Sequence, residues 1–508
     1  MDNGTPNITK TAFIITMITA GSRILGFLRE AVIAYVFGVG AVTDAYAVAL
    51  RVMTTAGLVT SVYLTTTFVP SYVRIREKKG DKLALLAANN ALGVSLAINV
   101  VLALLLFFSA PVILRILTGF EDVQMAYAIT AINILLIQLP VLTFVNFFSG
   151  YLNARKSFFG PSFIGIPMNV VFIIVCLALG TASGAAGLSG ASLMGVVSMF
   201  FVMFIWLPKE KYKYGFSVKF NTPEIRHDIK ILIPALLGSA LVDLKAWIDT
   251  IIATHLGEGN AAAIGFSSRL LGFVSGLIVL PLAGMTYAYM SEYAAKNDIK
   301  KMLEILWKTV RVILFIVLPI VIIAMPASFD VVRIVYERGQ FTPEATLLTG
   351  TALRWYMPGL LGLSLYIFLV RFFYGMQDTK TPMFVGIVAM GVNIALSIAL
   401  SRIMGIGGLT LATSIGHTLS ALLLLSLLRR KMGPLGFGQT AKDIIKMTLS
   451  VIPCAIAVLI ISQILAESNV IIRFGTSTAV GALLYIATAF LLKEMVARDF
   501  LALVMKRK

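Results

Sequence analysis

Long apolar runs recur from one end of this chain to the other, and they constrain its fold more than any other feature. A helix needs about 20 mostly apolar residues to cross the hydrocarbon core of a bilayer. The chain is therefore predicted to be an all-α polytopic membrane protein with 14 transmembrane helices. Hydropathy places these spans at residues 11–37, 41–70, 84–109, 125–152, 162–182, 187–207, 229–256, 261–290, 304–325, 343–375, 382–401, 407–428, 443–465 and 470–492.

The composition agrees with a membrane protein. Of 508 residues, 58% are hydrophobic and only 13% are charged, which is far more apolar than an average soluble domain. The longest polar connection, near residues 208–230, is too short to bury a core of its own. The first apolar run is too long and too interrupted by charge for a cleavable signal, so we expect it to remain as a helix. Cys176 and Cys454 lie in apolar runs and are interpreted as small buried hydrophobic residues.

Lysine and arginine residues gather in alternate connections between the spans. One side carries the basic clusters at 74–82, 155–156, 209–230, 296–301, 380, 429–442 and 493–508, whereas the opposite loops contribute only Arg115, Arg333, Arg338, Arg402 and Arg473. Cytoplasmic loops carry the positive excess, so both termini are predicted to be cytoplasmic and the number of spans to be even. Topology thus explains the net charge of +18, and no nucleic-acid partner is expected.

Two motifs recur in the same order in the two halves of the chain. Residues 161–166 and 382–387 open the fifth and eleventh spans, and residues 187–193 and 405–411 open the sixth and twelfth. Chance similarity between glycine-rich helix starts is the alternative. Six spans per repeat predict two lobes related by a pseudo-two-fold axis along the membrane normal. The predicted domains are 1–208, 209–430, and a C-terminal part, 431–508, that holds the last two helices.

Ionisable side chains interrupt the first span, which carries Arg23, Arg29 and Glu30. An arginine near the bilayer centre costs about 2.5–3.5 kcal/mol on insertion scales, so it normally faces a water-filled cavity or a partner. Arg23 and Glu30 share a face of an ideal helix, because seven residues make nearly two turns. Arg29 points elsewhere unless the helix bends near Gly26.

Further charges lie in later spans. Asp44 and Arg51 share a face of the second span, although Asp44 is also placed to cap a helix near the outer end. Arg269 lies inside the eighth span, and Arg371 lies near the cytoplasmic end of the tenth, where it could bind substrate or snorkel. The excess of arginine over carboxylate favours an anionic substrate with a phosphate or pyrophosphate group, since a guanidinium offers a planar fork of donors.

No motif for catalysis or metal binding was found. The sequence has no Gly-x-Ser-x-Gly, no phosphate-binding Walker loop and no His-Glu-x-x-His. His227, His255 and His417 are far apart and lack ligand spacing. The chain is therefore predicted not to be an enzyme, to hold no metal or cofactor, and not to use its own ATPase domain for transport.

Several motifs resemble those of the MviN/MurJ family of bacterial lipid II flippases. They are Ser22-Arg23-Ile24-Leu25-Gly26-Phe27-Leu28-Arg29-Glu30, Phe37-Gly38-Val39-Gly40, Thr43-Asp44-Ala45, Ser268-Arg269-Leu270, Tyr336-Glu337-Arg338-Gly339-Gln340-Phe341 and the run from Phe372 to Pro382. The resemblance implies the fold of the multidrug/oligosaccharidyl-lipid/polysaccharide exporter superfamily. In that fold two six-helix lobes enclose a cationic cavity, and two extra helices form a groove for the lipid tail.

The resemblance also implies which residues bind substrate. Ser22, Arg23, Arg29, Asp44 and Arg269 match positions that the family uses in the cavity, and Glu30 stands where the family often has aspartate. This chain departs from the family at two positions: Gly57 replaces an arginine and Gly272 replaces a glutamate. Arg51 is the hypothetical substitute for the first, and Arg371 is a further candidate.

The expected function is translocation of lipid II from the inner to the outer leaflet of the bacterial cytoplasmic membrane by alternating access. The first alternative is a flippase for another undecaprenyl-linked glycan (teichoic acid, capsule or O-antigen). The second is a cation-coupled drug exporter, which the excess of arginine disfavours. The driving force is expected to be the membrane potential or an unidentified coupling ion. The expected partners are the lipid-linked substrate and membrane lipids, and the expected state is a monomer.

Overall fold

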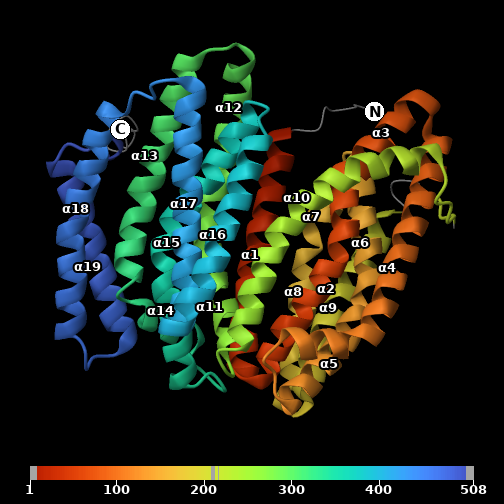
Figure 1. Ribbon diagram of the computed structural model, residues 1–508, viewed down its shortest axis with the longest axis horizontal. Helices are drawn as coiled ribbons and strands as arrows, with labels where there is room; N and C mark the ends of the chain where they lie inside the picture. The colour runs from red at the N-terminus through yellow and green to blue at the C-terminus, as the bar shows by residue number, and fades with distance from the viewer. Residues whose placement is uncertain (1–7, 208–211, 216, 499–508) are drawn as a thin grey trace. The chain divides into compact units, whose positions relative to one another are not determined.

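The computed structural model describes residues 8–207, 212–215 and 217–498, and every regular element in these ranges is a helix (Figure 1). The helices divide into two compact units. The first comprises residues up to Ala262 together with Arg338–Phe341, and the second comprises Ala263–Glu337 and the chain from Thr342 onward. The all-helical prediction is therefore confirmed for the described chain.

The first unit contains the helices of the N-terminal half and α10. Their bounds are α1 Ile8–Phe37, α2 Ala41–Val62, η1 Tyr63–Phe68, α3 Val69–Lys79, α4 Asp81–Leu117, α5 Asp122–Leu136, α6 Gln138–Ala154, α7 Phe159–Phe163, α8 Gly165–Leu179, η2 Thr181–Ser183, α9 Gly184–Trp206 and α10 Pro223–Thr254. Helix α1 packs along α8, and α2 packs against α5.

The second unit begins within α11 and runs to the C-terminal helices. Its elements are α11 Asn260–Val274, η4 Ser275–Val279, α12 Leu280–Ala295, α13 Ile299–Ala324, α14 Ser328–Tyr336, α15 Pro343–Gly375, α16 Lys380–Met404, α17 Ile406–Met432, α18 Phe437–Ile464 and α19 Val470–Leu491. Helices α15, α16 and α17 pack against one another, and α18 pairs with α19.

Twelve helical segments within the described residues are long and apolar enough to cross a membrane. The predicted spans 11–37 and 229–256 lie on α1 and α10, which are continuous helices of 30 and 32 residues but fall outside that set of twelve. The protein is thus a multi-pass membrane protein. The total of fourteen spans and the cytoplasmic position of both termini stay predictions.

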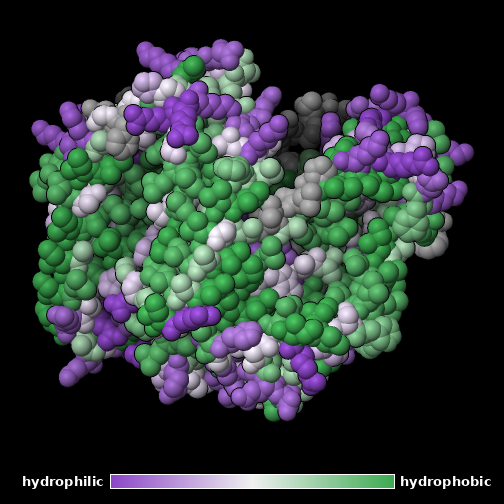
Figure 2. All heavy atoms as spheres, in the orientation of Figure 1, coloured by the Kyte–Doolittle hydropathy of each residue, from purple (hydrophilic) through white to green (hydrophobic). Residues whose placement is uncertain are grey.

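The surface of each unit suits a bilayer. Figure 2 shows hydrophobic residues over the flanks of both units and hydrophilic residues at the helix ends. Inside the first unit, small and branched apolar side chains such as Ala49, Ala128 and Leu135 are fully buried between α2, α4 and α5. Since lipid chains are as apolar as the core, such small residues let helix backbones approach closely and gain van der Waals contact.

Two equivalent spans of the predicted repeat contain a π-helical turn. The turn η1 lies in the second span and η4 lies in the eighth, and a proline follows each after one intervening residue, at Pro70 and Pro281. Proline lacks the N–H that an α-helical hydrogen bond needs and its ring crowds the preceding turn, so a local change of helix type at that point is expected.

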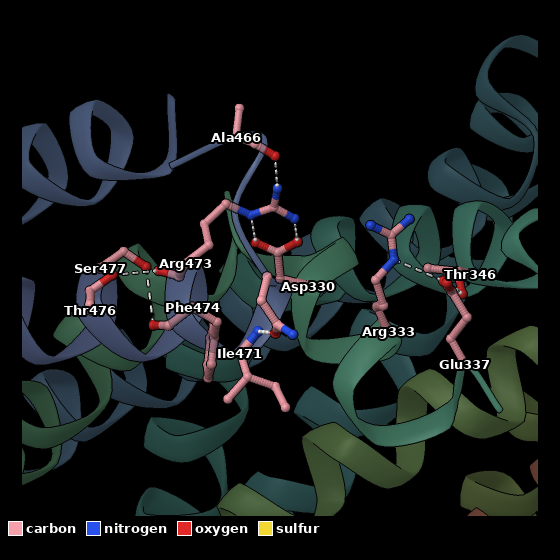
Figure 3. A network of polar contacts seen from close by, with 11 residues as sticks. Asp330, Arg333, Glu337, Thr346, Ala466, Ile471, Arg473, Phe474, Thr476 and Ser477 are labelled. Atoms are coloured by element: carbon pink, nitrogen blue, oxygen red, sulfur yellow. Dashed lines mark hydrogen bonds and ion pairs between the residues drawn. The ribbon is translucent and has the colours of Figure 1, made fainter. Parts of the chain in front are cut away.

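The hairpin of α18 and α19 is fastened to the second unit at both ends. At one end Arg311 of α13 bonds Asp443 of α18 at 2.9 Å, and their side chains are 11% and 3% exposed. At the other end the Nε and Nη2 groups of Arg473 in α19 each donate a hydrogen bond to the carboxylate of Asp330 in α14 (Figure 3). The hairpin therefore belongs structurally to the second unit, although the sequence places it outside the repeat.

Candidate functional site

Helix α1 presents three residues of the charged motif to α8. Ser22, Gly26 and Arg29 are spaced by four and three residues, so they fall on one helix face. A Cβ atom at Gly165 of α8 would lie only 2.1 Å from Ser22 Oγ, and one at Gly26 would lie 3.9 Å from the Asn169 amide. Glycine at 165 therefore permits the close approach that brings α8 to this face.

Arg29 is held inside the first unit by several contacts. Its Nη2 bonds Glu30 Oε1 at 2.7 Å, and the two side chains are only 17% and 12% exposed. Its guanidinium carbon lies 5.3 Å from the centre of the Phe172 ring, and its Nη1 lies 3.9 Å from Met168 Sδ. A cation over an aromatic face is attracted by the ring's electron density. Nε of Arg29 is buried with no hydrogen-bond partner.

The other arginines of the predicted site are exposed. Arg23 lies on α1 in the first unit, whereas Arg269 on α11 and Arg371 on α15 belong to the second. Helix α1 is continuous from Ile8 to Phe37, and six residues separate Arg23 from Arg29, which places them on different helix faces. The arrangement of the first-unit arginines relative to Arg269 and Arg371 stays a prediction.

Ser22 lines a second feature of the first unit, a cavity of about 670 Å³ beside α1. Its other lining includes Thr19 of α1, Asn153 at the end of α6, and Ser162 of α7. The side chain predicted to bind substrate therefore faces open space with further hydroxyl and amide groups around it.

Asp44 is fully buried and caps another helix. Its carboxylate accepts hydrogen bonds from the backbone N–H groups of Gly259 and Ala262, the latter at 2.7 Å, at the start of α11. Glu258, just before α11, caps α2 in turn: its Oε1 accepts a hydrogen bond from the backbone N–H of Ala41 at 2.9 Å. The two helix starts are thus capped reciprocally, which satisfies N–H groups that a helix leaves unpaired.

Arg51 of α2 forms a long ion pair with Asp243 of α10. Its Nη1 lies 3.9 Å from Asp243 Oδ1, and Asp243 also accepts a hydrogen bond from Thr55. Trp247 Nε1 donates to Thr55 Oγ1 at 2.6 Å, which completes the cluster. Lys245, two residues from Asp243, pairs instead with Asp249 at 2.6 Å, as expected of residues four apart on a helix.

The two positions where this chain departs from the family differ in their surroundings. A Cβ atom at Gly57 would touch Leu139 of α6 at 3.5 Å, whereas one at Gly272 would have nothing within 4 Å. Arg51 lies six residues before Gly57 and forms an ion pair with Asp243. Its predicted role as the substitute arginine is therefore not tested by its position alone.

Within the described chain, no group of three or more histidine, cysteine, aspartate or glutamate residues could hold a metal ion. Two of the histidines have other contacts. His227 Nε2 lies 2.7 Å from Arg74 Nη1, and His255 Nδ1 lies 2.9 Å from the Ile251 carbonyl oxygen.

Comparison with known proteins identifies the family. The model of the family described as "Lipid II flippase MurJ" matches residues 33–481. The chain belongs to the MurJ family. The predicted family is thus confirmed, and its model covers most of the chain, from the end of α1 into α19.

Relatives within the MurJ family align over most of their length. The Rickettsia prowazekii (strain Madrid E) protein named "Probable lipid II flippase MurJ" is 27% identical over 507 residues, covering 95% of this chain and 97% of that protein. The Rhizobium meliloti (strain 1021) protein of the same name is 25% identical over 422 residues, covering 81% of this chain and 78% of that protein.

Solved structures share the fold. One described as "Lipid II flippase MurJ, inward closed conformation" superposes with a TM-score of 0.79 at 22% identity and covers 96% of this chain and 100% of its own. An inward-facing multidrug resistance MATE family transporter of the MOP superfamily gives 0.70 at 15% identity, with 83% and 99% covered. These likenesses show the fold, which the chain shares with the MurJ and MATE structures.

Proposed function

We propose that this chain is a flippase that moves lipid II from the inner to the outer leaflet of the bacterial cytoplasmic membrane by alternating access. The observation that carries the proposal is the MurJ family match over residues 33–481, with relatives named as lipid II flippases along nearly the full chain. The chain acts as a monomer with both termini in the cytoplasm, and the α18–α19 hairpin carries the groove for the lipid tail.

The headgroup binds through guanidinium groups. Arg23 and Arg269 are exposed and contribute their guanidinium groups to the pyrophosphate, while Arg29 is aligned by Phe172 and held by Glu30. A phosphate oxygen would compete with Glu30 for the same guanidinium, since both are anionic acceptors of a charge-assisted hydrogen bond. Glu30 thus keeps this arginine neutralised until substrate arrives, and Ser22 adds a hydroxyl on the same face of α1, about two turns away.

Asp44 acts on this site indirectly. Its buried carboxylate fixes the start of α11, and Arg269 lies on that same helix, within three turns of the cap. We therefore assign Asp44 a positioning role rather than direct contact with the substrate. Arg51, paired with Asp243, supplies the second-span arginine that the family has at the position of Gly57.

The driving force is the membrane potential acting on charged groups that move during transport. One elementary charge crossing 100 mV gains about 2.3 kcal/mol, which is sufficient in scale for a cycle that releases the headgroup outward. A coupling ion in place of the potential would make transport depend on a gradient of that ion at zero potential.

Transport by proteoliposomes tests the proposal. The protein is reconstituted with lipid II, and the fraction of headgroup reachable from outside is measured over time with an imposed potential. Arg29→Ala and Arg29→Lys should each lower the initial rate at least tenfold, because lysine cannot offer the planar fork. Arg115→Ala, an exposed arginine at the end of α4, is the matched control and should keep the rate.

Other substrates decide between the proposal and its alternatives. Proteoliposomes carrying an undecaprenyl-linked teichoic acid or O-antigen precursor are assayed in the same way. Movement of such a glycan with no movement of lipid II would overturn the proposal and favour the neighbouring flippase function. Full complementation of flippase-depleted cells by the Arg51→Ala variant would show that Arg51 is not needed for substrate binding.

A further inference from the structure

A cavity of about 340 Å³ lies in the first unit, away from the charged face of α1. It is enclosed by the end of the second span, the start of α4, residues 215, 217, 219 and 222 of the connection before α10, and the first turns of α10. Its polar lining residues are Ser71, Lys79, Asn89, Asn90, Ser217, Lys219, Thr222, Glu224 and Asp228. Its remaining wall is aromatic and aliphatic, so it offers both a polar and an apolar surface.

The connection that closes this cavity is fastened to α4. The Asn89 amide donates to the Lys213 carbonyl at 3.1 Å, and the Asn90 amide donates to the Lys219 carbonyl at 2.9 Å and accepts from its N–H at 2.7 Å. A Cβ atom at Gly93 would lie 2.0 Å from the Ser217 carbonyl oxygen. Only glycine at 93 allows this approach, so the cavity is a built feature of the fold.

Asp228 is the buried acid of this cavity, and one of its carboxylate oxygens has no hydrogen-bond partner. Its side chain is buried, at 4% exposure, and Tyr63 donates to Oδ2 at 3.1 Å. Oδ1 has no hydrogen-bond partner. A buried carboxylate oxygen without a donor costs free energy. The Ser71 hydroxyl also lies beside this carboxylate, but Oδ1 can still accept a further hydrogen bond, and a cationic donor would stabilise the carboxylate most.

The aromatic wall is suited to the same cation. Tyr63, Phe68 and Tyr72 line the cavity, and the π-helical turn η1 runs from Tyr63 to Phe68. An ammonium group is attracted both to a carboxylate and to aromatic faces. Turns of this kind often occur at functional sites, and here the turn lies along the cavity wall.

The other lining residues indicate which chemical groups the ligand carries besides its ammonium. Lys219 and Lys79 line the cavity and are exposed; Lys79 already pairs with Glu224 at 3.2 Å. Leu83 and Leu86 of α4 also line it and are 49% and 57% exposed. A phosphate beside lysine and an acyl chain beside leucine are each favourable, so one molecule with all three parts matches the whole lining.

We propose that this cavity binds a phosphoethanolamine group, with its ammonium on Asp228 and its phosphate beside Lys219. The exposed leucines favour the membrane lipid phosphatidylethanolamine as the source of that group. Free phosphoethanolamine carries the same chemistry without the acyl chains. The site is separate from the arginines assigned to lipid II, so the inference does not depend on the proposed function.

Binding is measured on the full-length protein in two arms. In the first, calorimetry in detergent follows phosphoethanolamine, and Asp228→Asn should weaken its binding at least tenfold while Lys219→Ala weakens it severalfold. Asp81→Asn and Lys82→Ala are the matched controls on the neighbouring start of α4, outside the cavity lining, and should bind like the unmodified protein.

In the second arm the protein is placed in nanodiscs of phosphatidylethanolamine, phosphatidylcholine or phosphatidylglycerol. The melting temperature should be highest with phosphatidylethanolamine, because the quaternary ammonium of phosphatidylcholine cannot donate a hydrogen bond to Asp228. Leu86→Trp, a change at an exposed position, should fill the mouth and abolish the difference while the protein still elutes as a folded species.

Each outcome decides the inference. Binding of phosphoethanolamine with no preference among nanodiscs supports the free molecule as occupant, and the reverse supports the lipid. No binding in either arm, or equal binding by Asp228→Asn, overturns the inference and means that water satisfies Asp228. Loss of lipid II transport with intact phosphoethanolamine binding would overturn only the proposed function.

Discussion

The two charged residues of α2, Asp44 and Arg51, are matched by groups that lie far away in the chain. Asp44 meets backbone N–H groups more than two hundred residues later, at Gly259 and Ala262, and Arg51 meets Asp243. In a medium of low dielectric an unmatched charge is costly. The pattern therefore means that charged residues inside the spans of the first unit also hold its helices together.

Asp44→Ala is expected to destabilise the protein by roughly 2–4 kcal/mol, because two buried N–H groups at the start of α11 would lose a charged acceptor. The free energy of unfolding in detergent or bicelles measures the change. Glu467→Ala, an exposed acid between α18 and α19, should change that free energy by less than about 0.5 kcal/mol. An unchanged stability of Asp44→Ala would show that water replaces the carboxylate.

At the scale of elements, ion pairs at helix ends fix how the C-terminal hairpin packs on the second unit. Arg473 and Asp330 have side chains only 15% and 14% exposed and are joined by two bonds. Arg333 and Glu337 lie four residues apart at the end of α14, the helix that also carries Asp330, and Arg333 is 44% exposed (Figure 3). The two pairs form a natural comparison of a buried fork with an exposed contact.

A double-mutant cycle of Arg473→Gln and Asp330→Asn should give a coupling energy of about 1–3 kcal/mol, since the pair is bidentate and shielded from solvent. The same cycle with Arg333→Gln and Glu337→Gln should give about 0.3–0.5 kcal/mol, as for exposed pairs four residues apart. Unfolding free energies of the single and double variants measure both. Equal coupling energies would contradict the assigned role of Arg473.

The turn between α15 and α16 makes stability depend on pH. Partial burial alone would raise the pKa of Asp378, but hydrogen bonds from Lys431 at 2.8 Å and from Thr381 outweigh it and lower the pKa to about 2. An acid whose pKa is lower in the folded state stabilises above its unfolded pKa of about 4. This contribution is lost as the pH falls from about 4 to 2.

Asp378→Asn should therefore be less stable than the unmodified protein at pH 7, by on the order of 1 kcal/mol after allowance for solvent screening. The difference should shrink as the pH approaches 2. Melting temperatures across this pH range measure the effect. A constant difference at every pH would mean that Asp378 acts through packing and neutral hydrogen bonds alone.

At the scale of the whole molecule, the distribution of basic residues predicts which helix ends face the cytoplasm. The Lys296–Lys301 connection lies on the basic side, and the loop around Glu467 lies on the opposite side. Both native cysteines, Cys176 and Cys454, are buried, so they are poorly placed to react with a polar reagent. Topology can therefore be measured with single introduced cysteines.

A cysteine at Asn297 should be labelled by an impermeant maleimide only after intact cells are opened, and a cysteine at Glu467 should be labelled in intact cells, because the positive excess stays inside. Cysteine-free protein, with Cys176→Ala and Cys454→Ala, is the control for background. The reversed pattern would invert the orientation, and labelling of both in intact cells would contradict the five spans predicted between the two positions.

Much of the fold was predictable because its signals are local. Hydropathy located the helices to within a few residues in most cases, as the predicted span 470–492 and α19 at Val470–Leu491 illustrate. The charged residues of α1 were also recognisable from sequence. Their contacts were not: Phe172 and Met168 beside Arg29 carry no sequence signal, since an apolar residue on α8 could equally face lipid.

The sequence by itself determined the membrane class, the helical segments, the family and the candidate arginines, because each depends on short-range pattern or motif. Only the tertiary structure decided that Asp44 caps α11, that Arg51 pairs with Asp243, and that Asp228 lies in a cavity. The physical reason is that lipid and protein core are equally apolar. Hydrophobic periodicity therefore cannot tell which face of a membrane helix is buried.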